Sequence, residues 1–162
     1  MAGGLVYTAV GSEAMATAEY YGKAMCDLGK EHPEIVALTA DLAGSTKIGV
    51  FRKEFPDRFF NVGIAEQNMF GIAAGMAKAG LVPFVSTMSA FATMRVADQI
   101  HADICYQNVN VKIIGSHAGT SFGQAGSTHH AIVDMGCLLT FPNMTYLCPA
   151  DGMETVNAIR AA

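Results

Sequence analysis

The chain has 162 residues, of which 51% are hydrophobic and only 15% are charged, and its formal net charge at pH 7 is −4. This length favours one domain that buries a core of its own. The acidic balance and the lack of any cluster of Lys and Arg argue against binding to nucleic acid or to an anionic membrane surface. So low a charged fraction also indicates that another subunit covers part of the surface.

Helical and strand-like segments alternate along the chain. In chain order, the pattern predicts a helix over 13–32, a strand over 35–40, a short helix over 47–55, a strand over 59–63, a helix over 66–79, a strand over 82–88, a helix over 91–106, a strand over 111–116, a helix over 131–139, a strand over 144–148 and a helix from residue 151 onward. Unbroken apolar strands separated by helices are typical of a parallel sheet with both faces covered. The predicted fold is therefore α/β, with three layers in which helices cover both faces of a mostly parallel sheet.

Chemistry in such folds gathers just beyond the carboxyl ends of the strands. That rule selects Asp41, the segments 63–66 and 88–91, and the loop 117–129. The sequence stops within the last predicted helix, with neither a cap nor a stop signal. We therefore expect a single domain over residues 1–162 that is cut before a further C-terminal domain.

The cysteine pattern and the N-terminus indicate the compartment. The four cysteines are scattered, and no pair has C-x-x-C spacing, so they are typical of small core residues in a reducing cytosol. The N-terminus lacks the charged-then-apolar pattern of a signal peptide. The longest uncharged runs contain Pro, Gly and Ser, so no membrane span is predicted. We expect a cytoplasmic protein.

Glu66 stands at the junction of a predicted strand and a predicted helix, with apolar residues on both sides of it in the sequence. Acidic residues in the first turn of a helix often only complement the helix dipole. A carboxylate among hydrophobic side chains is nevertheless costly unless something binds it. Both interpretations, helix-end stabilisation and ligand binding, are open from the residue alone.

The loop 115–130 is rich in glycine and contains His117, His129 and His130. Glycine permits backbone with positive φ and close approach to a ligand, and histidine donates or accepts hydrogen bonds near neutral pH. An ordinary surface loop with hydrogen-bonded histidines is the alternative. The spacing of the histidines matches no zinc pattern, and neither a P-loop nor a nucleophile-elbow motif occurs.

Four segments, 39–42, 63–67, 86–91 and 117–129, occur in one order and with one spacing. Together they resemble the pyrimidine-binding domain of transketolase and of 1-deoxyxylulose-5-phosphate synthase, over nearly the whole chain from about Glu13. The length and the missing flanks resemble the start of the C-terminal subunit of a split transketolase. The resemblance implies a thiamine diphosphate-binding fold and transfer of a two-carbon ketol unit between sugar phosphates.

The resemblance implies that Glu66 is catalytic and binds the cofactor. Glu66 would hydrogen-bond N1′ of the aminopyrimidine ring of thiamine diphosphate, and a proton shared along that bond would activate the cofactor. Phe91 would pack on the ring, although core packing alone also explains this residue. Met88 and Met94 stand where many transketolases carry further aromatic residues. Asp41 matches an aspartate near the cofactor, with a helix cap after a strand as the alternative.

The resemblance also places substrate-binding residues. His117 and His129 match two histidines that line the substrate channel, and Ser45 matches a serine near the sugar phosphate, unless it is only a loop hydroxyl. Two departures put the sugar preference in doubt. Ala125 replaces an aspartate that reads a donor hydroxyl in typical transketolases. No arginine lies at 16–22, where the family usually supplies one for the substrate phosphate.

A partner is implied by a missing motif. The family holds the diphosphate through Mg²⁺ bound to a Gly-Asp-Gly motif with a downstream Asn on a separate domain, and the sequence contains no Gly-Asp-Gly. The expected partner is an N-terminal transketolase subunit that carries the diphosphate-binding domain and the Mg²⁺ ligands. We expect a heterotetramer or a homo-oligomer. Alone, the chain should be inactive and bind thiamine diphosphate weakly or not at all.

Three alternatives stay open. The enzyme 1-deoxyxylulose-5-phosphate synthase shares the Ala-Glu-Gln motif but typically places an arginine where Phe91 stands. The β subunit of 2-oxoacid dehydrogenases shares the fold and the glutamate but lacks the Thr-His after the glycine-rich loop. A non-catalytic assembly domain is the third, and the presence together of Glu66, Phe91, His117 and His129 speaks against it.

Overall fold

The computed structural model describes residues 15–162 and has a parallel sheet at its centre. The strands are β1 (Ile35–Thr39), β2 (Phe59–Asn61), β3 (Val82–Met88) and β4 (Lys112–Ser116), in the order β2-β1-β3-β4. All paired strands are parallel. Their carboxyl ends therefore meet at one edge of the sheet, as the sequence predicts. Residues 13 and 14, where the first helix is predicted to begin, lie outside the described residues.

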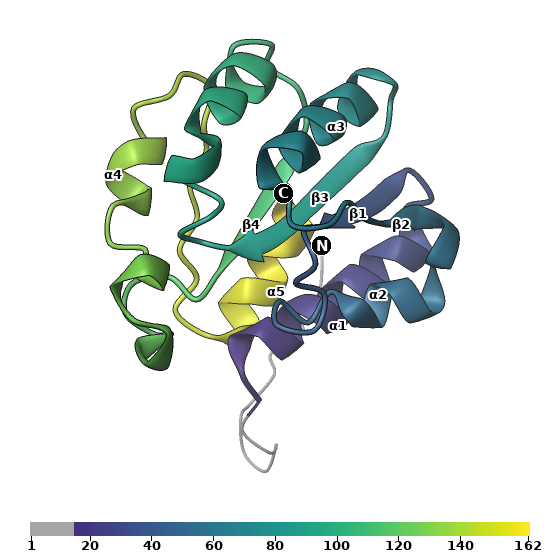
Figure 1. Ribbon diagram of the computed structural model, residues 1–162. Helices are drawn as coiled ribbons and strands as arrows, with labels where there is room; N and C mark the ends of the chain where they lie inside the picture. The colour runs from purple at the N-terminus through teal and green to yellow at the C-terminus, as the bar shows by residue number, and fades with distance from the viewer. Residues whose placement is uncertain (1–14) are drawn as a thin grey trace, which may run out of the picture.

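Helices cover both faces of this sheet (Figure 1). On one face lie α1 (Thr17–Glu31), α2 (Gly49–Glu54) and α5 (Gly152–Ala161). On the other lie α3 (Glu66–Lys78) and a helical segment between β3 and β4. The short helix α4 (Asp134–Leu138) lies beyond β4 at the side of the sheet. The predicted three-layer α/β fold is confirmed.

The strand β1 shows why its sequence is an unbroken apolar run. Val36 and Leu38 face the core that α3 completes, whereas Ile35 and Ala37 face the core that α1 completes. Every residue of β1 is buried. Successive side chains of a strand point to opposite faces, so a strand covered on both faces needs apolar residues at consecutive positions.

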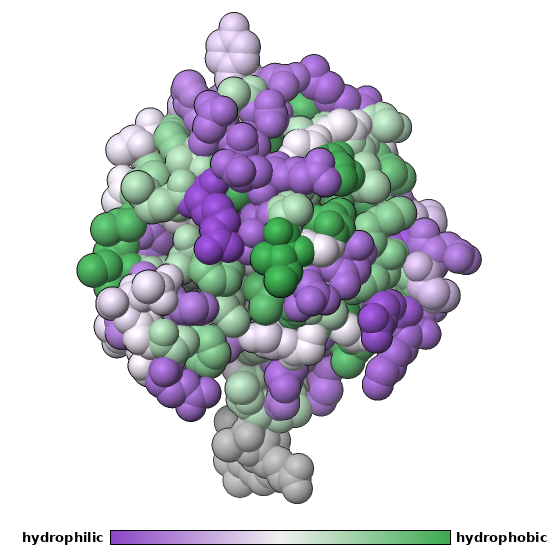
Figure 2. Space-filling model, viewed as in Figure 1, coloured by the Kyte–Doolittle hydropathy of each residue, from purple (hydrophilic) through white to green (hydrophobic). Residues whose placement is uncertain are grey.

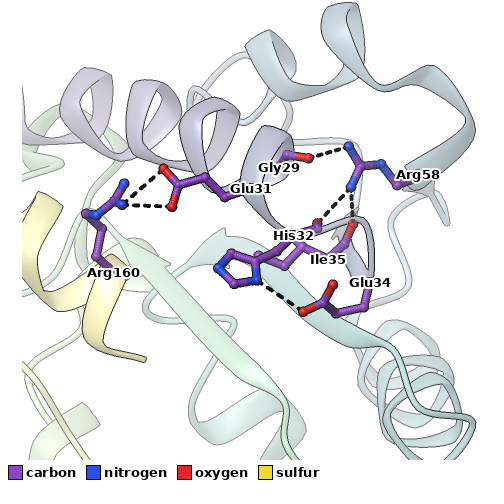
Figure 3. Close-up of polar contacts among 7 residues, drawn as sticks. All are labelled: Gly29, Glu31, His32, Glu34, Ile35, Arg58 and Arg160. Carbon is purple, nitrogen blue, oxygen red and sulfur yellow. Dashed lines mark hydrogen bonds and ion pairs between the residues drawn. The ribbon is translucent and has the colours of Figure 1, made fainter.

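Arg58 anchors the end of α1 to the sheet (Figure 3). Its guanidinium donates hydrogen bonds to backbone carbonyl oxygens of Gly29 at 2.7 Å, His32 at 3.0 Å and Ile35 at 3.4 Å. The last carbonyl groups of a helix lack partners within the helix, and Arg58 donates to that of Gly29, to that of the C-cap residue His32 and to that of the first residue of β1. The packing is completed by Phe55, whose ring centroid lies 4.1 Å from Arg58 Cζ.

The helix predicted over 91–106 is wrong as a single α-helix. The chain forms a turn after β3, then a 3-10 helix at Met94–Val96 and a π-helix at Gln99–Cys105. Thr93 Oγ1 donates to the carbonyl oxygen of Ser89 at 2.8 Å, in the turn that precedes the 3-10 helix. The buried positions 92, 96, 100 and 104 recur every four residues, an interval longer than the α-helical period of 3.6. This spacing suits a wider helix.

The strand predicted over 144–148 is also wrong, because this segment is extended but pairs with no strand among the described residues. Side chains hold it instead: Met144 and Tyr146 pack on the core beside α3, and Asn143 donates to the carbonyl oxygen of Cys105. The helix predicted over 131–139 is confirmed only at Asp134–Leu138. Within residues 15–162, no helix is long and apolar enough to cross a membrane.

Candidate functional site

Glu66 is the first residue of α3 and is buried, with 4% of its surface exposed. The turn before it depends on Gly63, whose φ of 76° lies in the left-handed region that side chains disfavour. Because Glu66 is in the first turn of α3, the positive end of the helix dipole stabilises its carboxylate. Glu66 also lines an open hollow of about 590 Å³, together with residues 64–68 and Arg95. Local sequence therefore places a buried acceptor at the wall of a hollow.

Arg95 is a site residue that the sequence analysis missed. Its Nη1 donates to Glu66 Oε1 at 2.9 Å, and its Cζ lies 3.9 Å from the ring centroid of Phe91. A planar guanidinium both forms ion pairs with carboxylates and stacks on aromatic faces. One signal was present: Arg95 follows Phe91 by four positions, and it is the only Lys or Arg between Lys78 and Lys112.

A chain of aromatic rings leads from Phe91 to the histidines of the glycine-rich loop. The ring of Phe91 lies 5.2 Å from that of His129, His129 lies 6.0 Å from Phe122, and Phe122 lies 4.7 Å from His117. These centroid separations are typical of aromatic pairs. The structure thus brings the predicted residues Phe91, His117 and His129 together, with Phe122 as a linker that the sequence analysis did not single out.

Hydroxyl groups next to the two histidines orient their rings. Ser116 Oγ lies 2.9 Å from Nδ1 of His117, and Thr128 Oγ1 lies 2.9 Å from Nδ1 of His129. In each pair the hydroxyl immediately precedes the histidine in the sequence. A hydrogen bond at one ring nitrogen determines how the other can act. Both rings are therefore held at Nδ1.

Two predicted site residues have left-handed backbone within two residues of the end of a strand. Asp41 follows β1 with φ of 60°, and His117 follows β4 with φ of 58°. The Asp41 amide donates to Asn61 Oδ1 at 2.9 Å, and Asn61 Nδ2 donates back to Asp41 Oδ1 at 3.2 Å. The structure thus places Asp41 at the mouth of the sheet, bonded to Asn61 and exposed.

The remaining predicted residues occupy different environments. Met88, at the end of β3, is buried with 6% of its surface exposed, so it lies beneath the surface at the carboxyl edge of the sheet. Met94 is 63% exposed and lies on the 3-10 helix that also carries Arg95. Ser45 is half-buried in the turn before α2. The structure does not bring Ser45 onto the chain of rings.

A second buried carboxylate is that of Asp134, at the start of α4. Its Oδ2 accepts hydrogen bonds from Ser89 Oγ at 2.8 Å and from the Tyr146 hydroxyl at 3.2 Å, and its Oδ1 accepts from the Met135 amide at 3.0 Å. Burial, together with the neighbouring Asp134, raises the pKa of Tyr146 to about 12. The network ties the end of β3 to α4 and to the extended segment after it.

No group of three His, Cys, Asp or Glu side chains within residues 15–162 is arranged to hold a metal ion. The site edge therefore offers a carboxylate, an aromatic face, an arginine and two oriented imidazoles. This set suits a planar, nitrogen-containing ring and a polar substrate. It does not by itself suit a metal-bound diphosphate, which needs several oxygen ligands around the cation.

Comparisons with known proteins agree with this geometry. The family described as the pyrimidine-binding domain of transketolase matches residues 13–162. A protein of Methanocaldococcus jannaschii, whose name refers to a transketolase C-terminal section, is 44% identical over 140 residues, which cover 86% of this chain and 44% of that protein. The 1-deoxy-D-xylulose-5-phosphate synthase of Clostridium perfringens is 44% identical over 138 residues, covering 84% of this chain and 22% of the enzyme.

One similar solved structure is described as a split gene transketolase in an inactive beta4 tetramer. It is 46% identical, superposes with a TM-score of 0.81, and is matched over 92% of this chain and 48% of its own. The present chain thus spans less than half the length of each of these relatives.

Proposed function

Because the chain belongs to the transketolase family, as a pyrimidine-binding domain, we propose that it supplies the pyrimidine half of a thiamine diphosphate site. A partner subunit would supply the diphosphate half. The assembled enzyme would transfer a two-carbon ketol unit between sugar phosphates.

The observation that carries this proposal is that the buried carboxylate of Glu66 and the half-buried ring of Phe91 contact the same arginine side chain. An aminopyrimidine needs a hydrogen-bonding group at its ring nitrogen and an apolar surface against its face. Glu66 and Phe91 offer these two features, and the guanidinium of Arg95 bridges them. When bound, thiamine diphosphate supplies the carbon atom that attacks the ketose and carries the two-carbon unit.

The residues of this chain would have different roles in holding the cofactor. Glu66 holds a proton that it shares with the ring nitrogen, and Phe91 orients the ring by stacking. Met88, Met94 and Asp41 are proposed to complete the cofactor side of the site.

Substrate binding is proposed for the glycine-rich loop and the turn before α2. His117 and His129 would donate or accept hydrogen bonds at the sugar hydroxyl groups, with their orientation held at Nδ1. Ser45 would contact the sugar phosphate.

Several observations support a two-chain site. Magnesium and its diphosphate need oxygen ligands, and the sequence has no Gly-Asp-Gly motif. The related split gene transketolase is described as inactive in its beta4 form. Large apolar side chains that flank α4 or lie in the extended segment after it are also exposed, namely Ile132 at 74%, Leu139 at 57% and Leu147 at 55%. Figure 2 shows apolar surface at the left margin, on the side where α4 lies. Exposed apolar groups of this kind favour a protein partner.

Capture of the partner tests this proposal. The tagged chain is incubated with thiamine diphosphate and Mg²⁺ in lysate of its own source, and the bound proteins are identified. We expect a subunit that contains Gly-Asp-Gly and a downstream Asn. Micromolar binding of thiamine diphosphate by the pure chain alone would contradict the half-site.

A second candidate is a subunit with 1-deoxy-D-xylulose-5-phosphate synthase activity, which the 44% identity to the Clostridium perfringens enzyme favours. The two activities form different products, so the captured complex is assayed for ketol transfer and for 1-deoxy-D-xylulose 5-phosphate in parallel. The phenylalanine at position 91 favours the transketolase reaction.

A further inference from the structure

The guanidinium of Arg95 contacts both groups that we assign to the aminopyrimidine ring. Its edge meets the Glu66 carboxylate, with Nη1 and Oε1 2.9 Å apart, and its Cζ lies 3.9 Å from the Phe91 centroid. A guanidinium is planar, carries N–H donors in its plane and stacks on aromatic rings. An aminopyrimidine shares the plane, the amino group and the stacking face. Arg95 thus presents the same two contacts from within the chain.

We propose that Arg95 is an internal occupant of the aminopyrimidine subsite, which the ring of the cofactor must displace. This inference rests on the proposed function, because it takes Glu66 and Phe91 as the contacts of the ring. Arg95 occupies the contacts on Glu66 and Phe91 until the cofactor arrives, then turns outward into solvent.

Burial identifies the partner that moves. Glu66 is fixed at the start of α3 with 4% of its side chain exposed, whereas 44% of the Arg95 side chain is exposed. Arg95 lines the open hollow in front of Glu66, so its long side chain can leave without unpacking the core. Val96, the next residue, is fully buried and keeps the backbone of the 3-10 helix in place.

The exchange has a chemical consequence for Glu66. A buried carboxylate is costly unless it is paired, and Arg95 provides the pairing charge while the ring is absent. Departure of Arg95 removes that cation at the moment when the ring nitrogen arrives. Glu66 is then free to share a proton with the ring. Arg95 is therefore a positioning residue that acts through Glu66.

A pyrimidine probe tests the competition directly. The full chain with labelled arginine and phenylalanine side chains is titrated with 4-amino-2-methylpyrimidine at millimolar concentration and followed by NMR. In the wild type, binding should shift the Phe91 ring signals and release the Arg95 guanidinium from its hydrogen bond. Arg95→Met should bind the probe about fivefold more tightly, since one half-exposed ion pair and one cation–π contact no longer compete.

The matched control is Arg52→Met. Arg52 also lies over a phenylalanine, with its Cζ 5.8 Å from the Phe59 centroid, but it lies away from Glu66 on α2. This variant should bind the probe like the wild type. A change of the same size in both variants would mean that loss of any surface cation suffices, and the inference would be wrong.

The remaining outcomes separate the two proposals. If the probe binds Arg95→Met no better than the wild type, or binds while Arg95 stays on Glu66, Arg95 does not occupy the subsite and the proposed function stands. If the probe binds no variant, including Arg95→Met, removal of Arg95 does not open the subsite and this inference is wrong. The proposed function expects little binding to the chain alone, so capture of the partner decides it separately.

Discussion

Arg58 and Arg95 both stack on phenylalanine rings, at 4.1 Å from Phe55 and 3.9 Å from Phe91, but they bind different acceptors. Arg58 donates to backbone carbonyl oxygens at the end of α1 and at the start of β1 (Figure 3). Arg95 donates to a side-chain carboxylate at the start of α3. A ligand cannot replace an arginine on backbone carbonyls without opening the fold. It can replace one on a carboxylate that faces a hollow.

The same residue type thus stabilises the fold in one region and, in another, occupies a site from which a ligand can displace it. Both arginines bind groups at a helix terminus: Arg58 binds carbonyl oxygens at the C-terminus of α1, and Arg95 binds the carboxylate at the N-terminus of α3. Only Arg95 lines an open hollow, and 44% of its side chain is exposed. The acceptor and the exposure, rather than the stacking, distinguish the two roles.

The largest expected effect is on activity, from Glu66→Gln in the assembled enzyme. Glutamine keeps the size of the side chain but cannot hold the shared proton, so kcat should fall about 100-fold or more. Steady-state assays of the wild type and of the variant, each reconstituted with the partner subunit, measure this. Unchanged activity would support a non-catalytic assembly domain instead.

Next in size is the loss of stability in Arg58→Met. The carbonyl oxygens of Gly29, His32 and Ile35 lose a charged donor, so the free energy of unfolding should fall by about 2 to 3 kcal/mol. Urea unfolding followed by circular dichroism measures the change. Arg52→Met is the control and should stay within about 0.5 kcal/mol of the wild type. A neutral Arg58→Met would break the comparison, because Arg58 would then be as dispensable as a surface residue.

A double-mutant cycle on Arg95 and Glu66 sharpens the comparison. The ion pair is half exposed on the arginine side, so its coupling free energy should be about 1 kcal/mol. Arg95→Met, Glu66→Gln and the double variant are unfolded in urea at low and at high salt. A coupling above that of the Arg58 contacts would show that Arg95 is structural, and would argue against its displacement.

Asp134 extends the comparison to a buried carboxylate that neutral groups hold. Tyr146→Phe removes one hydrogen bond to Asp134 and should destabilise the fold by about 1 kcal/mol. The folded pKa of Tyr146 is raised from 10.0 to about 12. The stability it contributes is therefore complete below about pH 10 and is lost as the pH rises toward 12. Wild-type stability should fall more steeply than that of Tyr146→Phe over this range in alkaline denaturation.

The smallest expected effect is that of Arg160→Met. Arg160 forms a two-pronged ion pair with Glu31 at 2.9 and 3.0 Å (Figure 3), but both side chains are exposed. Such pairs contribute about 0.5 kcal/mol, and salt screens them. Thermal unfolding at low and high ionic strength should show a small difference that vanishes in salt. A loss as large as that of Arg58→Met would mean that exposure does not separate these arginines.

The sheet could be predicted because its apolar runs have few alternatives. The apolar runs of β1 and β3 have the length of strands and lie between helical segments, which is typical of strands covered on both faces. The position of Glu66 follows from the glycine turn and the helical period after it. The contacts of Arg95 left a weaker signal, because a spacing of four residues from Phe91 does not by itself identify an ion pair with Glu66. The salt bridge of Arg95 depends on the turn and the 3-10 helix after β3, and the sequence analysis predicts a regular α-helix there.

The strand predicted over 144–148 was wrong for a related reason. Its alternation is real, since Met144 and Tyr146 pack inward while Leu147 is exposed. Alternation reports which side chains are buried, whereas strand assignment needs backbone hydrogen bonds to a neighbour. Tyr146 satisfies its hydroxyl on Asp134, and packing holds the segment without a ladder. The hydrogen bond between Tyr146 and Asp134 produces no periodic pattern in the sequence, so it could not be predicted.

The left-handed backbone of Asp41 and His117 has a consequence for engineering. Glycine adopts such backbone more easily than any other residue, so Asp41→Gly and His117→Gly are changes that a screen for heat resistance would favour. The same changes erase the side chains proposed for the cofactor and the sugar. Variants selected only for stability at high temperature would thus become more stable but inactive. Selection for turnover has to oppose that drift at these two positions.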